Sequence, residues 1–190
     1  MPYNTNFLYP FARNEFLKGQ IDWRVDNRFY LMFLNSGVGT ADVYGSTGSS
    51  HYAVDPKAQA ASTWAGWGVS NLSHIPFTHR SLNSSFPGGY GGTAVTDGYE
   101  LSGTATSIGN GVAEAGNVTG YAVPSGSMVS AFIIYRRPAT VTGYASTTAL
   151  DAVSELIAFF GDATGMPVAG NNGDITVQWD STQATRIFRL

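Results

Sequence analysis

The stretch MVSAFIIYR, residues 128–136, decides the fold of this chain. Apolar, β-branched and aromatic side chains run without interruption from Ala131 to Tyr135. Such a run is typical of a strand that is covered on both faces, and it is long enough to cross a sheet. We therefore predict a central strand over these residues, with the rest of the core arranged around it.

Further strand patterns lie on both sides of this stretch. Residues 29–34 form another continuous apolar run, and shorter segments follow at 93–95, 99–106 and 118–123, separated by turn residues rich in Gly, Asn and Pro. Short strands at short spacing predict antiparallel β-structure.

The C-terminal part predicts three more strands. Residues 154–160 read as a strand preceded by a helical or irregular insertion, although their apolar spacing also fits a helix. In residues 174–180, Ile175, Val177 and Trp179 face one way, because side chains alternate along a strand. A turn near 181–184 predicts a hairpin between this strand and the terminal residues TRIFRL.

These elements predict an all-β fold, mainly an antiparallel β-sandwich of jelly-roll type, with one short N-terminal helix. The helix is expected in FLYPFARNEFLKG, because Pro10 suits a first turn and Gly19 is placed to end it. We expect residues 1–20 to form an N-terminal arm and helix. Residues 21–190 are expected to form a single domain with long loops at about 36–70 and 137–152.

Charged residues make up only 12% of the 190 residues, about half the usual share, and the formal net charge is −3. No basic stripe is present, which argues against nucleic-acid binding, and the pair Arg136–Arg137 is expected to be a solvated strand end. The chain has no cysteine, no segment of the ~20 apolar residues that a membrane span needs, and no signal-peptide pattern. Low charge fits an assembly subunit and a secreted β-protein equally well.

No catalytic or metal-binding motif stands out. The acidic residues are scattered, and His51, His74 and His79 lack zinc-site spacing. GVGTAD lacks the last glycine of a dinucleotide fingerprint. We expect no enzyme activity, no cofactor and no metal.

The assembled motifs resemble a family of small virion structural proteins of tailed bacteriophages. The matching segments are AR, FL, G and IDW within 12–23, LS and IP within 72–76, VTDG at 95–98, LIA at 156–158, TGMPV at 164–168, GDITV at 173–177, WD at 179–180 and RIFRL at 186–190. The loops at 36–70 and 137–152 are longer than the family pattern. The shared residues are turns and apolar strands, so they identify a scaffold better than a role.

The resemblance implies a capsid decoration or cement protein that binds the outside of the major capsid shell and stabilises it. It implies synthesis in the host bacterial cytoplasm, location on the virion, and a homo-oligomer such as a trimer, without nucleic-acid or membrane partners. An oligomeric clip engages several capsid subunits at once and gains from effective concentration. The candidate partner contacts are aromatic side chains of the arm and of the loops: Tyr3, Phe7, Tyr9, Phe11, Trp64, Trp67 and Tyr90.

Three alternatives stay open. The arm could pack on its own domain instead of on a partner. The protein could belong to the tail, neck or fibre of the virion. It could also be a carbohydrate-binding β-sandwich in which Trp64, Trp67 and Tyr90 stack on sugars.

Overall fold

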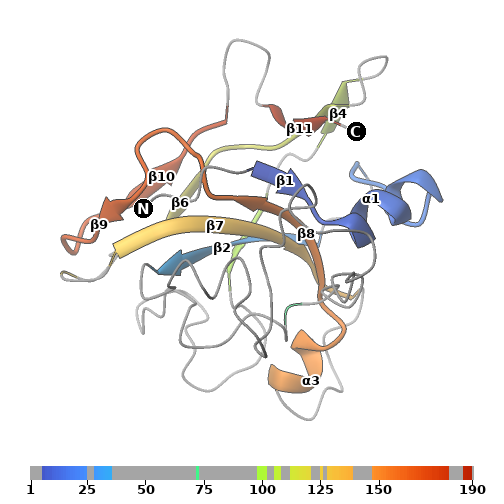
Figure 1. Cartoon of the computed structure of the whole chain (residues 1–190), viewed down its shortest axis with the longest axis horizontal. Coiled ribbons are helices and arrows are strands. Elements are labelled where there is room, and N and C mark those ends of the chain that lie inside the picture. Colours follow the sequence, from blue (N-terminus) through green and yellow to red (C-terminus); the bar gives the residue numbers. More distant parts are fainter. Residues whose placement is uncertain are drawn as a thin grey trace, which may run out of the picture.

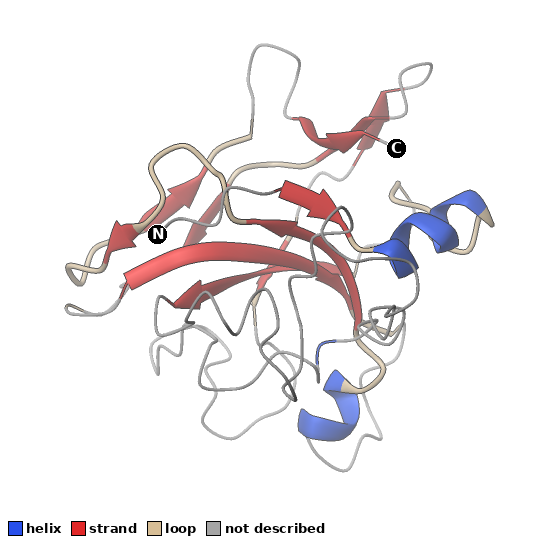
Figure 2. Cartoon of the chain, viewed as in Figure 1, coloured by secondary structure: helices blue, strands red, loops and turns tan. Residues whose placement is uncertain are grey.

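The computed structural model describes residues 6–24, 28–35, 72, 98–101, 105–107, 112–120, 125, 128–138, 147–179 and 186–189. Within them the chain is built of antiparallel β-sheets with a short N-terminal helix (Figure 1, Figure 2). The predicted all-β fold class is therefore confirmed.

The main sheet has six strands, and five of them follow the order β1–β8–β7–β2–β3. Their bounds are β1 Asn6–Leu8, β8 Glu155–Phe160, β7 Met128–Arg136, β2 Phe29–Asn35 and β3 Tyr99–Glu100. The sixth strand, β9 (Val168–Ala169), pairs with the start of β7. The strand predicted over 128–136 is thus confirmed at both ends, and it lies in the centre of the sheet.

The centre of the main sheet is the core of the protein. Ile134 on β7 pairs with Leu31 on β2 and with Ala158 on β8. All three are buried, and so are their neighbours on both faces of β7 from Ala131 to Tyr135. The unbroken apolar run of β7 fits its place in the centre of the sheet, because a strand covered on both faces needs apolar side chains at every residue.

Two smaller sheets lie on one side of the main sheet (Figure 1). One pairs β10 (Ile175–Val177) with β6 (Val118–Gly120). The other has the order β11–β5–β4, with bounds β11 Arg186–Arg189, β5 Val112–Glu114 and β4 Ala105–Ser107. Trp179, just after β10, meets Phe132 of the main sheet edge-on at 5.9 Å between ring centroids, so side chains fill the space between the two layers.

The helix α1 spans Pro10–Leu17. Pro10 occupies its first turn, where a missing N–H costs nothing. At its end the Gly19 N–H donates to the Phe16 carbonyl at 3.0 Å, and the Gln20 N–H donates to Glu15 at 2.9 Å. Gly19 has φ +70°, which is the left-handed conformation that this kind of C-terminal cap requires. The predicted helix and its end at Gly19 are confirmed.

The other predicted helical segment precedes β8. The short helix α3 covers Thr147–Asp151, and the strand β8 begins four residues after it. The strand interpretation of residues 154–160 is therefore correct. The residues at helical spacing do not share a buried face, since Val153 is 43% exposed, whereas the four consecutive residues Leu156 to Phe159 are all less than 2% exposed, as in a strand covered on both faces.

The predicted C-terminal hairpin is wrong. The strand β10 pairs with β6, and β11 pairs with β5, both antiparallel. The two last strands therefore take partners from the segment 112–120 and not from each other. Turn residues between two strands permit a hairpin, but hydrogen bonds to more distant strands override that local preference.

Two of the short strand segments differ from their predicted extent. The segment 99–106 contains two strands, β3 and β4, which belong to different sheets. The segment 118–123 is a strand over Val118–Gly120, and its last three residues lie outside the described residues, as does 93–95. β5 was not predicted, because the turn pattern Gly109–Asn110–Gly111 directly before it concealed a strand of only three residues.

The expectation that Arg136 and Arg137 form a solvated strand end is also wrong. The Arg136 side chain is 13% exposed and forms an ion pair with Glu155, donating from Nε at 2.7 Å, while its Nη1 donates to the Gln20 carbonyl at 3.1 Å. Arg137 is 1% exposed. Arg136 thereby links the end of β7 to β8 and to the segment that follows α1.

Candidate binding cleft

A cleft of about 540 Å³ opens between the main sheet and β10. Its described lining consists of uncharged side chains: Asn6, Phe132, Phe160, Ala163, Thr164, Met166, Val168, Ile175, Thr176, Val177, Gln178, Trp179 and Ile187. This volume lies within the range of about 300–1,000 Å³ that is usual for sites that bind small molecules.

The floor of the cleft is an aromatic cluster from three elements. The rings of Phe132 on β7 and Phe160 on β8 stack at 4.8 Å with an angle of 17° between their planes. Trp179 lies against both, at 5.9 Å from Phe132 and 6.1 Å from Phe160. The cluster is placed by strand pairing, because Phe132 and Phe160 are direct partners in the register of β7 and β8.

Hydrogen bonds hold Trp179 in this position. Its indole Nε1–H donates to the Gly116 carbonyl at 2.8 Å, and its backbone N–H donates to Asn117 Oδ1 at 3.4 Å. The side chain is 7% exposed. Trp179 therefore gives the floor of the cleft a ring of fixed orientation, because its indole N–H is bonded to the chain's own backbone and its ring is packed against other side chains.

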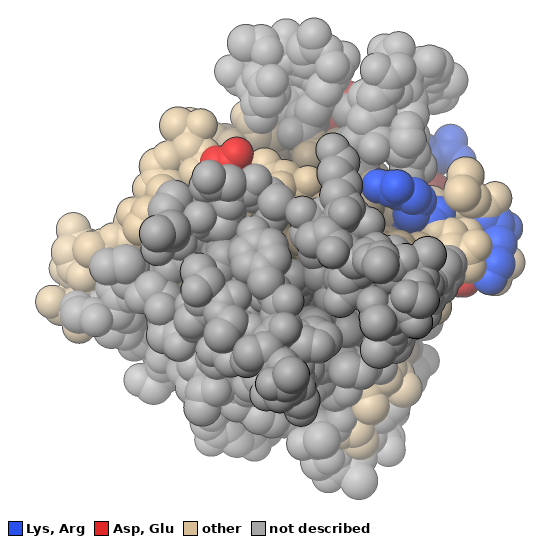
Figure 3. Space-filling view, in the orientation of Figure 1, with Lys and Arg blue, Asp and Glu red and all other residues tan. Residues whose placement is uncertain are grey.

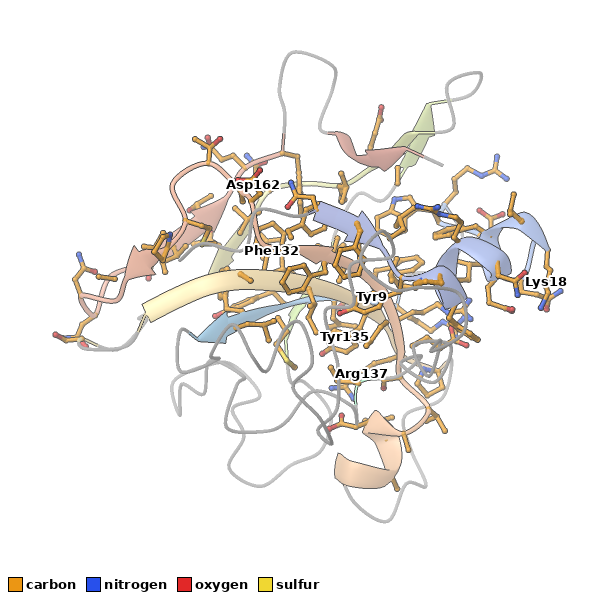
Figure 4. The ribbon with its side chains drawn as sticks, in the orientation of Figure 1. Tyr9, Lys18, Phe132, Tyr135, Arg137 and Asp162 are labelled. Carbon is orange, nitrogen blue, oxygen red and sulfur yellow. The ribbon has the colours of Figure 1, made fainter. Side chains whose placement is uncertain are left out.

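The rim of the cleft is polar. Thr164, Thr176, Gln178 and Asn6 are exposed, whereas Val177 and Trp179 are buried. Asn6 is bonded in both directions to Asp162: its Nδ2 donates to the Asp162 carbonyl at 3.3 Å, and the Asp162 N–H donates to Asn6 Oδ1 at 3.0 Å. This pair connects β1 to the loop after β8 at one end of the cleft (Figure 4).

Chemically, the cleft is suited to binding. None of its described lining residues is ionisable, so that lining supplies no general acid, general base or charged ligand. Elsewhere in the described part of the chain, no group of three or more His, Asp and Glu side chains is placed to hold a metal ion.

A second cluster surrounds Arg137, which lies toward α3 (Figure 4). Its guanidinium carbon lies 5.6 Å from the ring centroid of Tyr30 and 5.4 Å from that of Tyr135. Its Nη2 donates to the Tyr135 hydroxyl at 3.4 Å, and its backbone N–H donates to the Arg28 carbonyl at 3.0 Å. Cation–π contacts of this kind stabilise a guanidinium that has lost water.

The arrangement also affects Tyr30. Partial burial, followed by the negative charge of Glu100, raises the pKa of Tyr30, and the positive charge of Arg137 opposes this rise. The cluster contributes to the fold, because Tyr30 and Tyr135 are direct partners across β2 and β7.

Two of the predicted contact residues of the arm, Phe7 and Tyr9, lie against the main sheet of the same chain. Phe7 is half-buried and stacks on Phe159 at 5.3 Å, and its ring meets that of Tyr9 at 5.2 Å. Tyr9 is 2% exposed, and its backbone N–H donates to Ile157 at 3.0 Å. Phe11 is half-buried on α1. Phe7 and Tyr9 thus follow the alternative in which the arm packs on its own domain.

The remaining predicted contacts, Tyr3, Trp64, Trp67 and Tyr90, lie outside the described residues. The sequence did not single out Phe132, Phe160 or Trp179 as a site. The sequence did contain a signal for Trp179. The alternation of Ile175, Val177 and Trp179 predicts that they share one face, and Val177 and Trp179 are both buried.

Charge is unevenly placed on the surface. In the space-filling view, the Lys and Arg side chains of described residues gather at the end of the molecule that carries α1 (Figure 3). Lys18 there forms an exposed ion pair with Glu15, and Arg24 forms one with Asp22, whose hydrogen bond and charge raise the pKa of Arg24. The cleft lies apart from these charges, next to β10.

Within the described residues, no helix is both long and apolar enough to cross a membrane. Comparison of the chain with protein-family models, with curated proteins and with solved structures gives no match.

Proposed function

We propose that this chain is a structural protein of a tailed-bacteriophage virion and that it decorates the outside of the capsid. Its partner would be the major capsid protein, and it would act as a homo-oligomer that clips neighbouring capsid subunits together. The proposal starts from the resemblance of residues 12–23 and 154–190 to that family.

The observation that carries it is the convergence of these two segments on one short piece of chain. Trp23 donates its indole N–H to the Glu114 carbonyl at 2.8 Å, and Trp179 donates to Gly116 at the same distance. Both tryptophans are buried. The residues that carry the resemblance thus build a shared scaffold, as expected for a family defined by an architectural role.

Two further features support a role in assembly. The chain has half the usual share of charged residues, which suits broad uncharged contacts with other proteins. The cleft between the main sheet and β10 has no ionisable group among its described lining residues, which suits binding better than catalysis.

The test is quantitative mass spectrometry of purified virions together with cryo-EM of the intact particle. A decoration protein is expected in many copies per particle, as density outside the mature shell. Particles made without the protein should bind the purified chain and then withstand heating better. Only a handful of copies, located at the tail or neck, would instead support the tail-associated alternative.

The carbohydrate-binding alternative is tested separately. If the chain is a decoration protein, a glycan array should give no signal. Trp64→Ala and Trp67→Ala should then bind glycan-coated surfaces no differently from the unaltered protein. A specific glycan signal that either substitution removes would favour that alternative over a decoration role.

A further inference from the structure

The strand β10 presents its edge to the cleft. Ile175, Thr176, Val177 and Gln178 are consecutive, and all four line the cleft. Successive side chains of a strand point to opposite faces, so a cleft beside one face would be lined by every second residue. Lining by consecutive residues means that the cleft borders the backbone edge of the strand.

The pairing of β10 supports this geometry. Among the described strands, β10 pairs with β6 alone, in the register Ile175 with Gly120, Thr176 with Thr119 and Val177 with Val118. None of these three β6 residues is among the described lining of the cleft. The strand β6 therefore occupies one edge of β10, and the cleft lies along the other.

From these relationships we propose that the cleft is a docking site for an extended, uncharged segment of a partner protein, which adds a strand to the edge of β10 that faces the cleft and that no other described strand occupies. Main-chain hydrogen bonds to β10 would supply affinity, and alternate side chains of the segment would enter the cleft. Those side chains would be apolar, because they would meet Phe132, Phe160 and Trp179.

The lining also defines the charge of the occupant. A charged side chain that entered this cleft would lose water without gaining an opposite charge, because the described lining has none. The rim groups Thr176 and Gln178 are exposed and uncharged, so they suit the polar side chains of the segment that point to solvent. The cleft would accept such a segment whether or not the chain is a virion component.

The experiment is a binding titration with a panel of acetylated and amidated heptapeptides. In these probes, Thr alternates with Val, Leu, Ile, Met or Phe, and no residue is charged. Binding is followed by NMR of the isotope-labelled protein, and hydrogen exchange is measured at the amides of residues 175–178. We expect at least one probe to bind and to slow exchange several-fold at the alternate amides of this stretch that point away from β6. The same probe with a central Pro should bind at least tenfold more weakly, since Pro removes a strand donor.

Variants locate the site. Ala163→Phe should fill the cleft and weaken binding at least tenfold. Gln178→Glu adds a negative charge at the rim and hardly changes the shape of the side chain. It should weaken the binding of a probe that carries Asp near residue 178 more than the binding of the uncharged probe, because like charges repel. The matched control is Gln20→Glu, an exposed substitution outside the cleft, which should leave binding unchanged. Thermal melting of each variant shows that it is folded.

Three results would overturn the proposal. The first is that no probe binds at millimolar concentration. The second is binding that leaves the amides of 175–178 unaffected or that survives Ala163→Phe in a folded variant. The third is protection of these amides that rises with protein concentration in the absence of any probe, which would make a second copy of this chain the occupant.

Discussion

Trp23 and Trp179 lie near opposite ends of the sequence, yet their indole N–H groups donate to carbonyl oxygens only two residues apart, those of Glu114 and Gly116. The segment between β5 and β6 is thus held from both sides, by the stretch after α1 and by the stretch after β10. Since β5 also pairs with β11 and β6 with β10, this segment joins the N-terminal and C-terminal parts of the fold.

The first prediction concerns this pair of indoles. Trp23→Phe and Trp179→Phe keep an aromatic ring but remove the donor, so each should lower the free energy of unfolding by about 1–2 kcal/mol. Because both act on one segment, the double variant should depart from additivity by about 0.5 kcal/mol or more. Chemical denaturation measures all three values.

The two indole protons provide an independent check of this prediction. In the wild-type protein both should exchange slowly with solvent, since each is bonded and buried. Rapid exchange of either, or strict additivity of the two substitutions, would show that the tryptophans do not hold a common segment.

The second prediction concerns the contact of Gly98 with β2 and β7. A Cβ at this position would lie 2.7 Å from the Tyr135 hydroxyl and 2.8 Å from the Leu31 carbonyl, and Gly98 has φ +151°. Gly98→Ala should therefore destabilise the protein by about 2–4 kcal/mol, from overpacking and backbone strain together. Thermal or chemical unfolding measures the loss.

Gly19→Ala is the matched control for this substitution. Gly19 also has positive φ, at +70°, but a Cβ there meets nothing within 4 Å. Its cost should be only the backbone term of about 1 kcal/mol. Equal losses for the two variants would mean that the close approach at Gly98 is relieved without cost.

The third prediction is a loss of stability at high pH through Tyr9. Complete burial raises the pKa of its hydroxyl above the usual value of about 10. A raised pKa means that the folded state retains the proton which the unfolded state releases. The stability that Tyr9 contributes is therefore fully present below pH ~10, and it falls by up to about 1.4 kcal/mol per pH unit above it.

Replacement of this hydroxyl tests the assignment. Tyr9→Phe should flatten the alkaline limb of the stability curve, and Tyr30→Phe should flatten it less, because Tyr30 is only partly buried and lies near Arg137. An alkaline limb that is the same in wild type and in Tyr9→Phe would place the titrating group elsewhere.

The fourth prediction concerns the C-terminal strand. Removal of residues 186–190 deletes β11, its pairing with β5 and the buried side chain of Ile187. We expect loss of cooperative unfolding, or a large fall in the melting temperature, before any specific loss of binding. Circular dichroism and particle binding, measured on the same sample, separate the two effects.

A point substitution accompanies the truncation. Ile187→Ala removes only the buried side chain and should cost about 2–5 kcal/mol, depending on how far the core can close around the gap. If the truncated chain folded normally but no longer bound particles, β11 would be an interaction element and not part of the scaffold.

Much of the local structure could be predicted from residue patterns. The strands over 29–34, 128–136 and 154–160 and the helix ending at Gly19 were all recognised, because burial and caps leave local signals. Pairing was harder: the predicted hairpin of the last two strands is wrong, since hydrogen-bond partners for β10 and β11 come from residues 112–120.

The cleft could not be predicted from the sequence for the same reason. Phe132, Phe160 and Trp179 carry no motif in common, and they meet only because β7 pairs with β8 and β10 is placed over them. Arg137 was expected in solvent, because sequence cannot show that two tyrosines flank the guanidinium.

By itself, then, the sequence determined the class of the fold, the identity of its central strand and the alternation that sends Val177 and Trp179 inward. These depend on side-chain periodicity and backbone preference, which are local properties of the chain. Only the tertiary structure decided which strands pair, which charged groups are buried and where a cleft is left open. Those outcomes depend on free energies of contact between residues distant in the sequence, and no short stretch of sequence contains both partners.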